Sequence, residues 1–215
     1  MTYVITGLNG SLEKYKELKK TARIKDTDTV YAVGGIAAAD LELLNELSME
    51  ANVYSVMDKN DWRALRMLSG FERMLGSGGT PDMEYITEMR AWVADGGQSA
   101  LDAFMASDSD TKEGILDYLG ELAMFEEAEV KGKEYIIIGA GLTDVDPDSD
   151  LYELEPESFT AEPLDMDKKY LDGRIIITAQ ATRSYDKVTR IGDNICLDCG
   201  CAVCLCLETG KEFYA

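Results

Sequence analysis

The first 71 residues repeat one pattern three times: a short apolar run, a glycine-rich or polar turn, and a segment with apolar residues at helical spacing. The apolar runs cover residues 2–6, 30–33 and 53–57. A parallel sheet needs such helical crossovers between consecutive strands. The pattern therefore predicts an α/β fold, in which ligands are usually held by the loops at the carboxyl ends of the strands.

The turns between these strands and helices carry little reactive chemistry. Ser11 is predicted to cap the first helix, with Tyr15 and Leu18 on its buried face and Lys14 on its solvent face. The second loop offers only glycine, isoleucine and alanine before a helix expected to begin at Asp40. Residues 58–61 are predicted to form a polar turn before the third helix. The second loop thus lies where an α/β fold usually binds its ligand, but it lacks polar side chains that could do so.

The rest of the chain predicts a helical insert followed by short strands. Residues 70–122 read as helical, with Thr80 as a cap, Pro81 in the first turn and a break at residues 96–97. A hairpin is expected around residues 131–133, and residues 143–163 are expected to be a surface loop. The remaining strands are predicted at residues 174–178, 187–190, 194–198, 202–207 and 212–214. Two packed sheets with helices outside, in a single domain spanning residues 1–215, fit this order.

Composition limits the possible partners. Forty-one acidic and twenty-one basic residues give a formal charge of −20, which repels phosphate backbones and anionic lipids, so neither a nucleic acid nor a membrane is an expected partner. The amino terminus lacks the basic segment of a signal peptide, and a cytoplasmic location is predicted. The chain contains no histidine, the commonest general acid–base residue and transition-metal ligand.

The strand ends, taken together, resemble those of a known family. The segments YVITGLNG, YAVGGIAAADL, VMDKNDWRAL, IIIGAGL, IITAQATR and NICLDCGC follow the order seen in calcineurin-like metallophosphoesterases. The similar branch comprises bacterial phosphoprotein phosphatases and diadenosine-tetraphosphate hydrolases. The resemblance implies a four-layer α/β/β/α sandwich of two mixed sheets flanked by helices, with a helical insert. It also implies two divalent metals that activate a water for attack on phosphorus.

At every position that corresponds to a metal ligand of the family, this chain has a different type of residue. These positions are Gly7, Asn9, Gly35, Ala38, Lys59, Asn60, Gly139 and Gln180. The family's phosphate-binding arginines correspond to Ala39 and Ala161. The surviving acids near these motifs are Asp40, Asp58, Asp61 and Asp198. We therefore predict no catalytic residue, no bound metal and no cofactor, and we expect the eight family ligands, restored as a set, to recover metal binding.

Lys59 suggests how the missing metal charge could be replaced. Its ammonium could occupy the place of a cation and pair with Asp58 or Asp61. A surface lysine beside surface acids, whose pairing contributes little stability, is the alternative interpretation.

Three functions remain open at this stage. The first is a catalytically inactive phosphatase-like protein that binds an unknown protein or small molecule as a scaffold or regulator. The second is an active serine/threonine-phosphatase-like enzyme whose metal site is rebuilt from the surviving acids. The third is a metal or redox protein based on the cysteine cluster, although buried strand cysteines often act as small apolar residues. The five cysteines are Cys196, Cys199, Cys201, Cys204 and Cys206.

Overall fold

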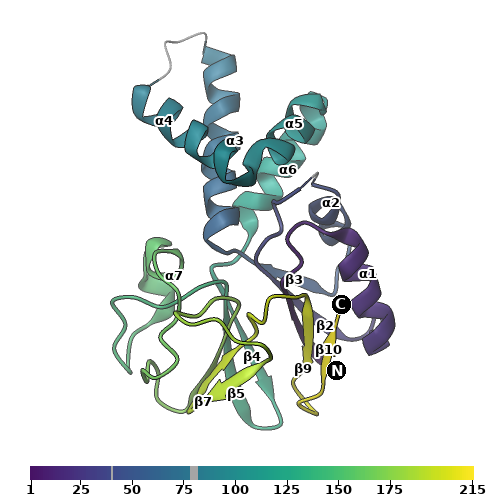
Figure 1. Ribbon diagram of the computed structural model, residues 1–215, viewed down its shortest axis with the longest axis vertical. Helices are drawn as coiled ribbons and strands as arrows, with labels where there is room; N and C mark the ends of the chain where they lie inside the picture. Colours follow the sequence, from purple (N-terminus) through teal and green to yellow (C-terminus); the bar gives the residue numbers. More distant parts are fainter. Residues whose placement is uncertain (40, 78–81) are drawn as a thin grey trace.

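Two mixed β-sheets pack face to face in the computed structural model, which describes residues 1–39, 41–77 and 82–215. Figure 1 shows the sheets in the lower half of the molecule. The first sheet has the order β10 (Glu212–Tyr214), β9 (Val203–Cys206), β1 (Thr2–Thr6), β2 (Thr29–Val33) and β3 (Val53–Val56). The second has the order β4 (Phe125–Val130), β5 (Lys133–Ile138), β6 (Arg174–Thr178), β8 (Asn194–Cys196) and β7 (Thr189–Ile191).

Strand directions confirm the predicted mixture of parallel and antiparallel pairs. β1, β2 and β3 are parallel, and β9 and β10 continue the sheet in antiparallel directions. In the second sheet β5, β6 and β8 are parallel, with antiparallel β4 and β7 at the edges. The β4–β5 turn is shorter than predicted: Lys131 and Gly132, both with positive φ, make a two-residue turn, and Lys133 already belongs to β5.

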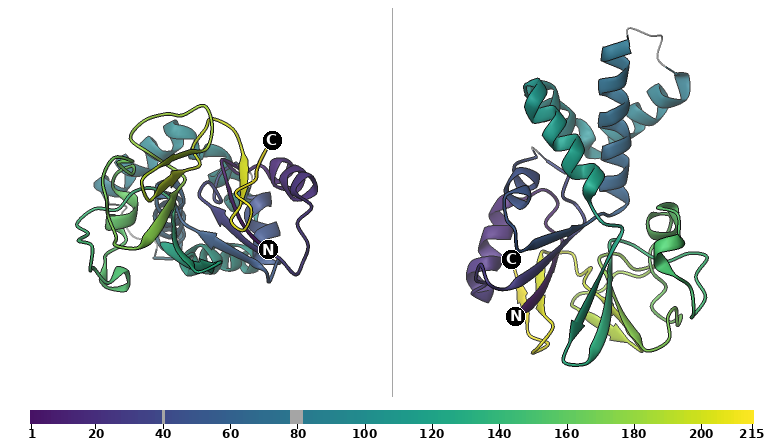
Figure 2. Two further views of the ribbon diagram at one scale, coloured as in Figure 1. Left: turned by 90° about the horizontal axis from the view of Figure 1, so that it is seen from below. Right: turned by 180° about the vertical axis from the view of Figure 1, so that it is seen from behind.

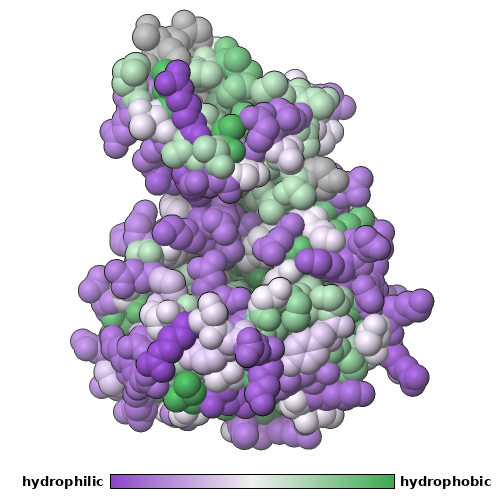
Figure 3. All heavy atoms as spheres, in the orientation of Figure 1, coloured by the Kyte–Doolittle hydropathy of each residue, from purple (hydrophilic) through white to green (hydrophobic). Residues whose placement is uncertain are grey.

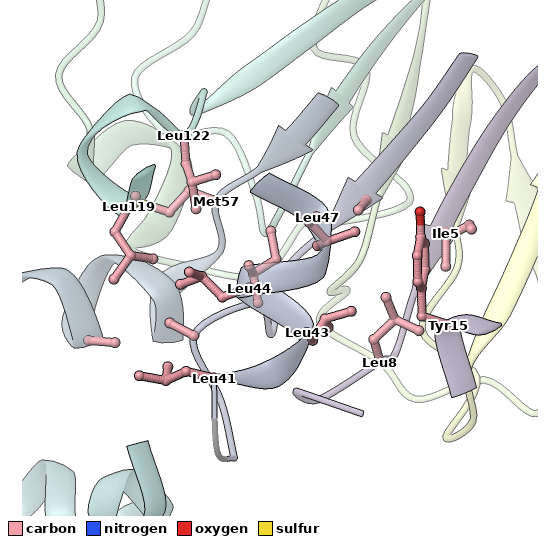
Figure 4. Packing of buried hydrophobic residues seen from close by; sticks show 14 of the residues in the cluster. Ile5, Leu8, Tyr15, Leu41, Leu43, Leu44, Leu47, Met57, Leu119 and Leu122 are labelled. Carbon is pink, nitrogen blue, oxygen red and sulfur yellow. The ribbon is translucent and has the colours of Figure 1, made fainter. Parts of the chain in front are cut away.

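Strand alternation divides the apolar side chains between two sides of the first sheet. Tyr3 and Ile5 face the helices α1 (Leu12–Ala22) and α2 (Glu42–Ser48), whereas Val4 faces the second sheet. Figure 4 shows the helix-side core, where residues from α1, α2 and the β1–α1 loop meet. These labelled residues include Ile5, Leu8, Tyr15, Leu43, Leu44 and Leu47. Burial of these faces fixes the positions of the strand ends.

The outer face of the second sheet is covered mainly by loops. This layer contains the 3₁₀ turn η2 (Leu151–Glu153) and the short helix α7 (Glu157–Thr160). The prediction of a surface loop at residues 143–163 is wrong for Leu151 and Phe159, which are almost completely buried against Ile136 and Ile138. The four-layer sandwich is confirmed, and its fourth layer is thin.

The helical insert projects from one end of the sandwich (Figure 2). It contains α3 (Lys59–Ser77), α4 (Met83–Trp92), the π-helical turn η1 (Val93–Gly97), α5 (Gln98–Ala106) and α6 (Ser109–Glu121). Lys59 is the first residue of α3 rather than part of a turn, and α3 runs unbroken through residue 70. Gly96, whose φ of 108° is not helical, separates two helices by a kink, which confirms the predicted break at residues 96–97. None of the helices in the described ranges combines the length and apolar composition needed to cross a bilayer.

The start of α4 differs from the prediction. Asp82 is itself the N-cap, because its carboxylate accepts a hydrogen bond from the Glu84 amide and the helix begins at Met83. The predicted cap Thr80 and first-turn Pro81 lie outside the described residues.

Candidate functional site

A polar cavity of about 200 Å³ lies where the loops from both sheets meet. Its walls come from the loops after β1, β2, β3, β6 and β8, and from α1. Five of the eight positions that the resemblance assigned to metal ligands line it, although they are far apart in sequence. They are Gly7, Asn9, Gly35, Asn60 and Gln180, and the acids Asp58 and Asp198 lie in the same wall.

The other predicted positions fall outside this cavity. Ala38 lines an adjoining hollow, and Gly139 is buried against the backbone of Met57 and Asp58. Ala39 is exposed with φ 54°. Asp40 lies outside the described residues.

Lys59 does not pair with the neighbouring acids. Its exposed side chain and Ala161 line a separate hollow between α3, α4 and α7. Within the described chain, none of the ion pairs includes Lys59. The hypothesis of a lysine replacing the metal charge is therefore wrong, because the first turn of α3 directs this residue outward.

Neighbouring backbone occupies the space that two of the family ligands would need and crowds the position of a third. A Cβ on Gly7 would lie 2.4 Å from the Cys201 carbonyl oxygen, and one on Gly139 would lie 2.2 Å from the Met57 carbonyl oxygen. At Gly35 the nearest atom would be the Asn9 amide nitrogen at 3.1 Å. Gly7 and Gly35 also have φ values of 73° and 65°, which residues with a side chain rarely adopt. At Gly7 and Gly139, main-chain atoms lie where the side chain of a family ligand would begin.

The two surviving acids after β3 are committed to backbone hydrogen bonds. Asp58 caps α3: its Oδ1 accepts from the amides of Asn60 and Asp61 at 2.8 and 2.9 Å. Asp61 Oδ1 accepts from the amides of Ile36 and Ala37, both at 2.7 Å, and its Oδ2 accepts from the Asp58 amide at 3.3 Å. Asp61 thereby ties the β2–α2 loop to the start of α3.

Burial sets the protonation of this pair. It raises the pKa of Asp58, although hydrogen bonds from backbone amides oppose the rise. Burial, followed by repulsion from Asp58, raises the pKa of Asp61 well above its usual value. The hydrogen bond between the two carboxyl groups lowers the pKa of Asp58 and raises that of Asp61, so it favours the proton on Asp61. Neither acid then resembles a free metal-binding carboxylate.

The donor set does not fit a two-metal centre. Hard divalent ions need several uncommitted oxygen ligands, and transition metals favour imidazole or thiolate as well. Within residues 1–39, 41–77 and 82–215, no group of three or more histidine, cysteine, aspartate or glutamate side chains could hold an ion.

The five cysteines do not gather into one cluster. Cys204 and Cys206 are buried beneath the helices, whereas Cys196 packs on the loop-covered face of the second sheet. Burial raises the pKa of Cys196 to about 11 and that of Cys204 to about 12. Three of the cysteines therefore act as small apolar residues, while Cys199 and Cys201 lie together beside the cavity.

Sequence reasoning missed two contributors to the site. Lys14, predicted on the solvent face of α1, lines the cavity because Ser11 starts the helix immediately after the β1 loop. The adjoining hollow shares Asn9, Gly35 and Asn60 with the cavity and extends to Trp92 in the insert. Figure 3 shows a largely hydrophilic surface where the outline narrows between the insert and the sandwich. Lys14 could have been assigned to the site from its place in the first helical turn after a strand. No local sequence feature indicates that Trp92 lies near the site.

Comparison with solved structures supports this fold assignment. The chain is similar to a structure described as a putative diadenosine tetraphosphatase, with 13% identity, coverage of 100% of this chain and 92% of that chain, and a TM-score of 0.67. It is also similar to the hypothetical protein PH1004 from Pyrococcus horikoshii OT3, with 13% identity, coverage of 100% and 87%, and a TM-score of 0.51. No family model and no curated protein matches the chain. The chain thus shares with these structures the fold of an α/β sandwich, in which two mixed sheets are flanked by helices.

Proposed function

We propose that this chain is a catalytically inactive protein with a metallophosphoesterase-like fold, which binds a protein or small molecule instead of hydrolysing a phosphoester. The observation that carries the proposal is the packing of Gly7, Gly35 and Gly139 against neighbouring main chain. Aspartate and histidine cannot replace these glycines unless the loops move. The site differs from a metal centre in its backbone as well as in its side chains.

The cavity has the chemistry of a hydrogen-bonding site. The side chains of Asn9, Asn60 and Gln180 offer both donors and acceptors, and Lys14 adds one cation beside Asp58 and Asp198. A phosphoesterase needs concentrated positive charge to stabilise a phosphoryl transition state. This balance favours a small polar ligand or a polar segment of a partner protein over a phosphate anion.

Metal retention tests the proposal. We expect the wild-type protein, exposed to Mn²⁺, Mg²⁺ or Zn²⁺ and then desalted, to retain none of them by elemental analysis. Its hydrolysis of bis(p-nitrophenyl) phosphate with Mn²⁺ should equal that of buffer. Stoichiometric Mn²⁺ together with hydrolysis would contradict the proposal and favour a rebuilt phosphoesterase site.

Two variants with contrasting expected results accompany the metal-retention measurement. The triple variant Asn9→His, Asn60→His and Gln180→His changes side chains that share the cavity and is expected to retain Zn²⁺, because imidazole suits zinc. The full restoration, which adds Gly7→Asp, Gly35→Asp, Ala38→Asp, Lys59→Asn and Gly139→His, is expected to unfold at a lower temperature and to retain no metal. The sequence resemblance alone predicts the opposite result, that the full set recovers metal binding, so the measurement decides between the two predictions.

A further inference from the structure

The segment between β8 and β9 crosses the wall of the cavity and brings two thiols together. The chain bends at Gly200, which has φ 75°, and the Sγ atoms of Cys199 and Cys201 lie 3.7 Å apart. Cys201 is partly exposed and lines the cavity, whereas Cys199 is only 9% exposed and packs in the core between the sheets. One accessible thiol thus lies beside one protected thiol.

A second pair with the same spacing provides an internal comparison. Cys204 and Cys206 are also separated by one residue, but they belong to the extended strand β9. Their exposed fractions are 0% and 1%, and both side chains lie in the core beneath α1. A soluble oxidant reaches Cys201 more easily than either of them.

We propose that Cys199 and Cys201 form a reversible disulfide that reshapes the cavity wall, with a small disulfide such as oxidised glutathione as the oxidant. Cys201 loses its proton to solvent and attacks one sulfur of the oxidant, which expels one glutathione thiolate. Cys199 then loses its proton and attacks the Cys201 sulfur, and the second glutathione thiolate leaves. The protein loses two hydrogen atoms, and one glutathione disulfide becomes two thiols.

Access decides the order of these two steps. Cys199 is only 9% exposed, and burial raises its pKa to about 11, so both access and thiolate content disfavour its direct attack on a soluble oxidant. Cys201 is therefore the attacking group and Cys199 the resolving group.

The position of the bend connects the thiols to the cavity. The Cys201 carbonyl packs directly against Gly7, and the Cys201 side chain lines the wall. An S–S bond is about 2 Å long, so the sulfur atoms must approach each other. Gly200 is exposed, and a Cβ built on it would meet no atom within 4 Å, so the bend has room to adjust. Disulfide formation therefore moves the wall beside Gly7.

Intact-mass analysis after exposure to oxidised glutathione and an acid quench, which stops thiol exchange, tests the proposal. All five cysteines lie between Arg190 and Lys211, so variants identify the bonded pair better than tryptic digestion. The wild type and the Cys204→Ala/Cys206→Ala variant should lose the mass of two hydrogen atoms and regain it with dithiothreitol. Cys199→Ala should instead accumulate glutathione on Cys201 to at least about 10-fold higher occupancy than the wild type. Cys201→Ala should show neither product.

Two results would contradict a disulfide between Cys199 and Cys201. Hydrogen loss that persists in Cys199→Ala but disappears in the Cys204→Ala/Cys206→Ala variant would assign the disulfide to β9 and overturn the proposal. A stable mixed disulfide on the wild type would also overturn it. Thermal unfolding of each reduced variant checks that it is folded, and Cys199→Ser provides a second test if Cys199→Ala is unstable. Metal retention is measured separately, so this proposal and the proposed function can fail independently.

Discussion

Gly139→Ala is expected to lower the free energy of unfolding by about 3 kcal/mol or more. The added methyl group would lie 2.2 Å from the Met57 carbonyl oxygen and 2.7 Å from the Asp58 Cα. Both are main-chain atoms held by neighbouring structure, since the Met57 amide donates to the Ala123 carbonyl and Asp58 caps α3. The clash can be relieved only if β3 and β5 move apart. Urea unfolding followed by circular dichroism measures the change.

A glycine in open space gives the matched control. Gly114 lies within α6, and a Cβ built there would meet no atom within 4 Å. Gly114→Ala is therefore expected to raise the free energy of unfolding by about 0.5–1 kcal/mol, because alanine favours the helix. Equal effects of the two substitutions would show that β3 and β5 are not packed as closely as the structure has them.

Asp61→Ala is expected to cost about 3 kcal/mol of the free energy of unfolding, whereas Asp61→Asn should cost little near neutral pH. Alanine leaves the amides of Ile36 and Ala37 buried without an acceptor. Asparagine keeps an acceptor oxygen for them, and its NH₂ group can donate to the Asp58 carboxylate in place of the shared proton. Thermal or urea unfolding of the two variants separates the hydrogen bonds from the charge.

The pH dependence of the same pair has a defined sign. A carboxyl group whose pKa is raised by folding binds more protons in the folded state than in the unfolded state. Its contribution is most favourable below the unfolded pKa of about 3.9 and is lost as pH rises through the folded pKa. The stability of Asp61→Asn relative to the wild type should therefore increase from pH 4 toward pH 8. If Asp61→Asn were as unstable as Asp61→Ala at pH 8, the result would mean that Asp61 is ionised in the folded protein.

Local patterns predicted the fold well because they report on burial. The apolar run of β1 and the helical spacing of Tyr15 and Leu18 each identify residues that must leave water, and the structure buries them. Boundaries were less accurate where a side chain bonds to backbone. Asp58 caps α3, which begins at the next residue, and Asp82 caps α4, which begins at Met83. These caps depend on side-chain geometry that residue type alone does not specify.

The candidate site was predictable in position but not in chemistry. The family resemblance assigned Gly7, Gly35 and Gln180 to one site, and all three line one cavity. The sequence indicated that ligand side chains were missing, but not that main chain had filled their places. It also suggested a Lys59 ion pair that the first turn of α3 directs away from the acids.

The sequence by itself determined the α/β class, the two mixed sheets and the absence of histidine, because periodicity and composition are properties of the chain alone. Only the tertiary structure decided how the surviving groups are used. It packs Gly139 on the β3 end, commits Asp61 to the β2–α2 loop and brings the thiols of Cys199 and Cys201 to 3.7 Å. The distances between loops depend on how the sheets and helices pack, and no single segment contains that information.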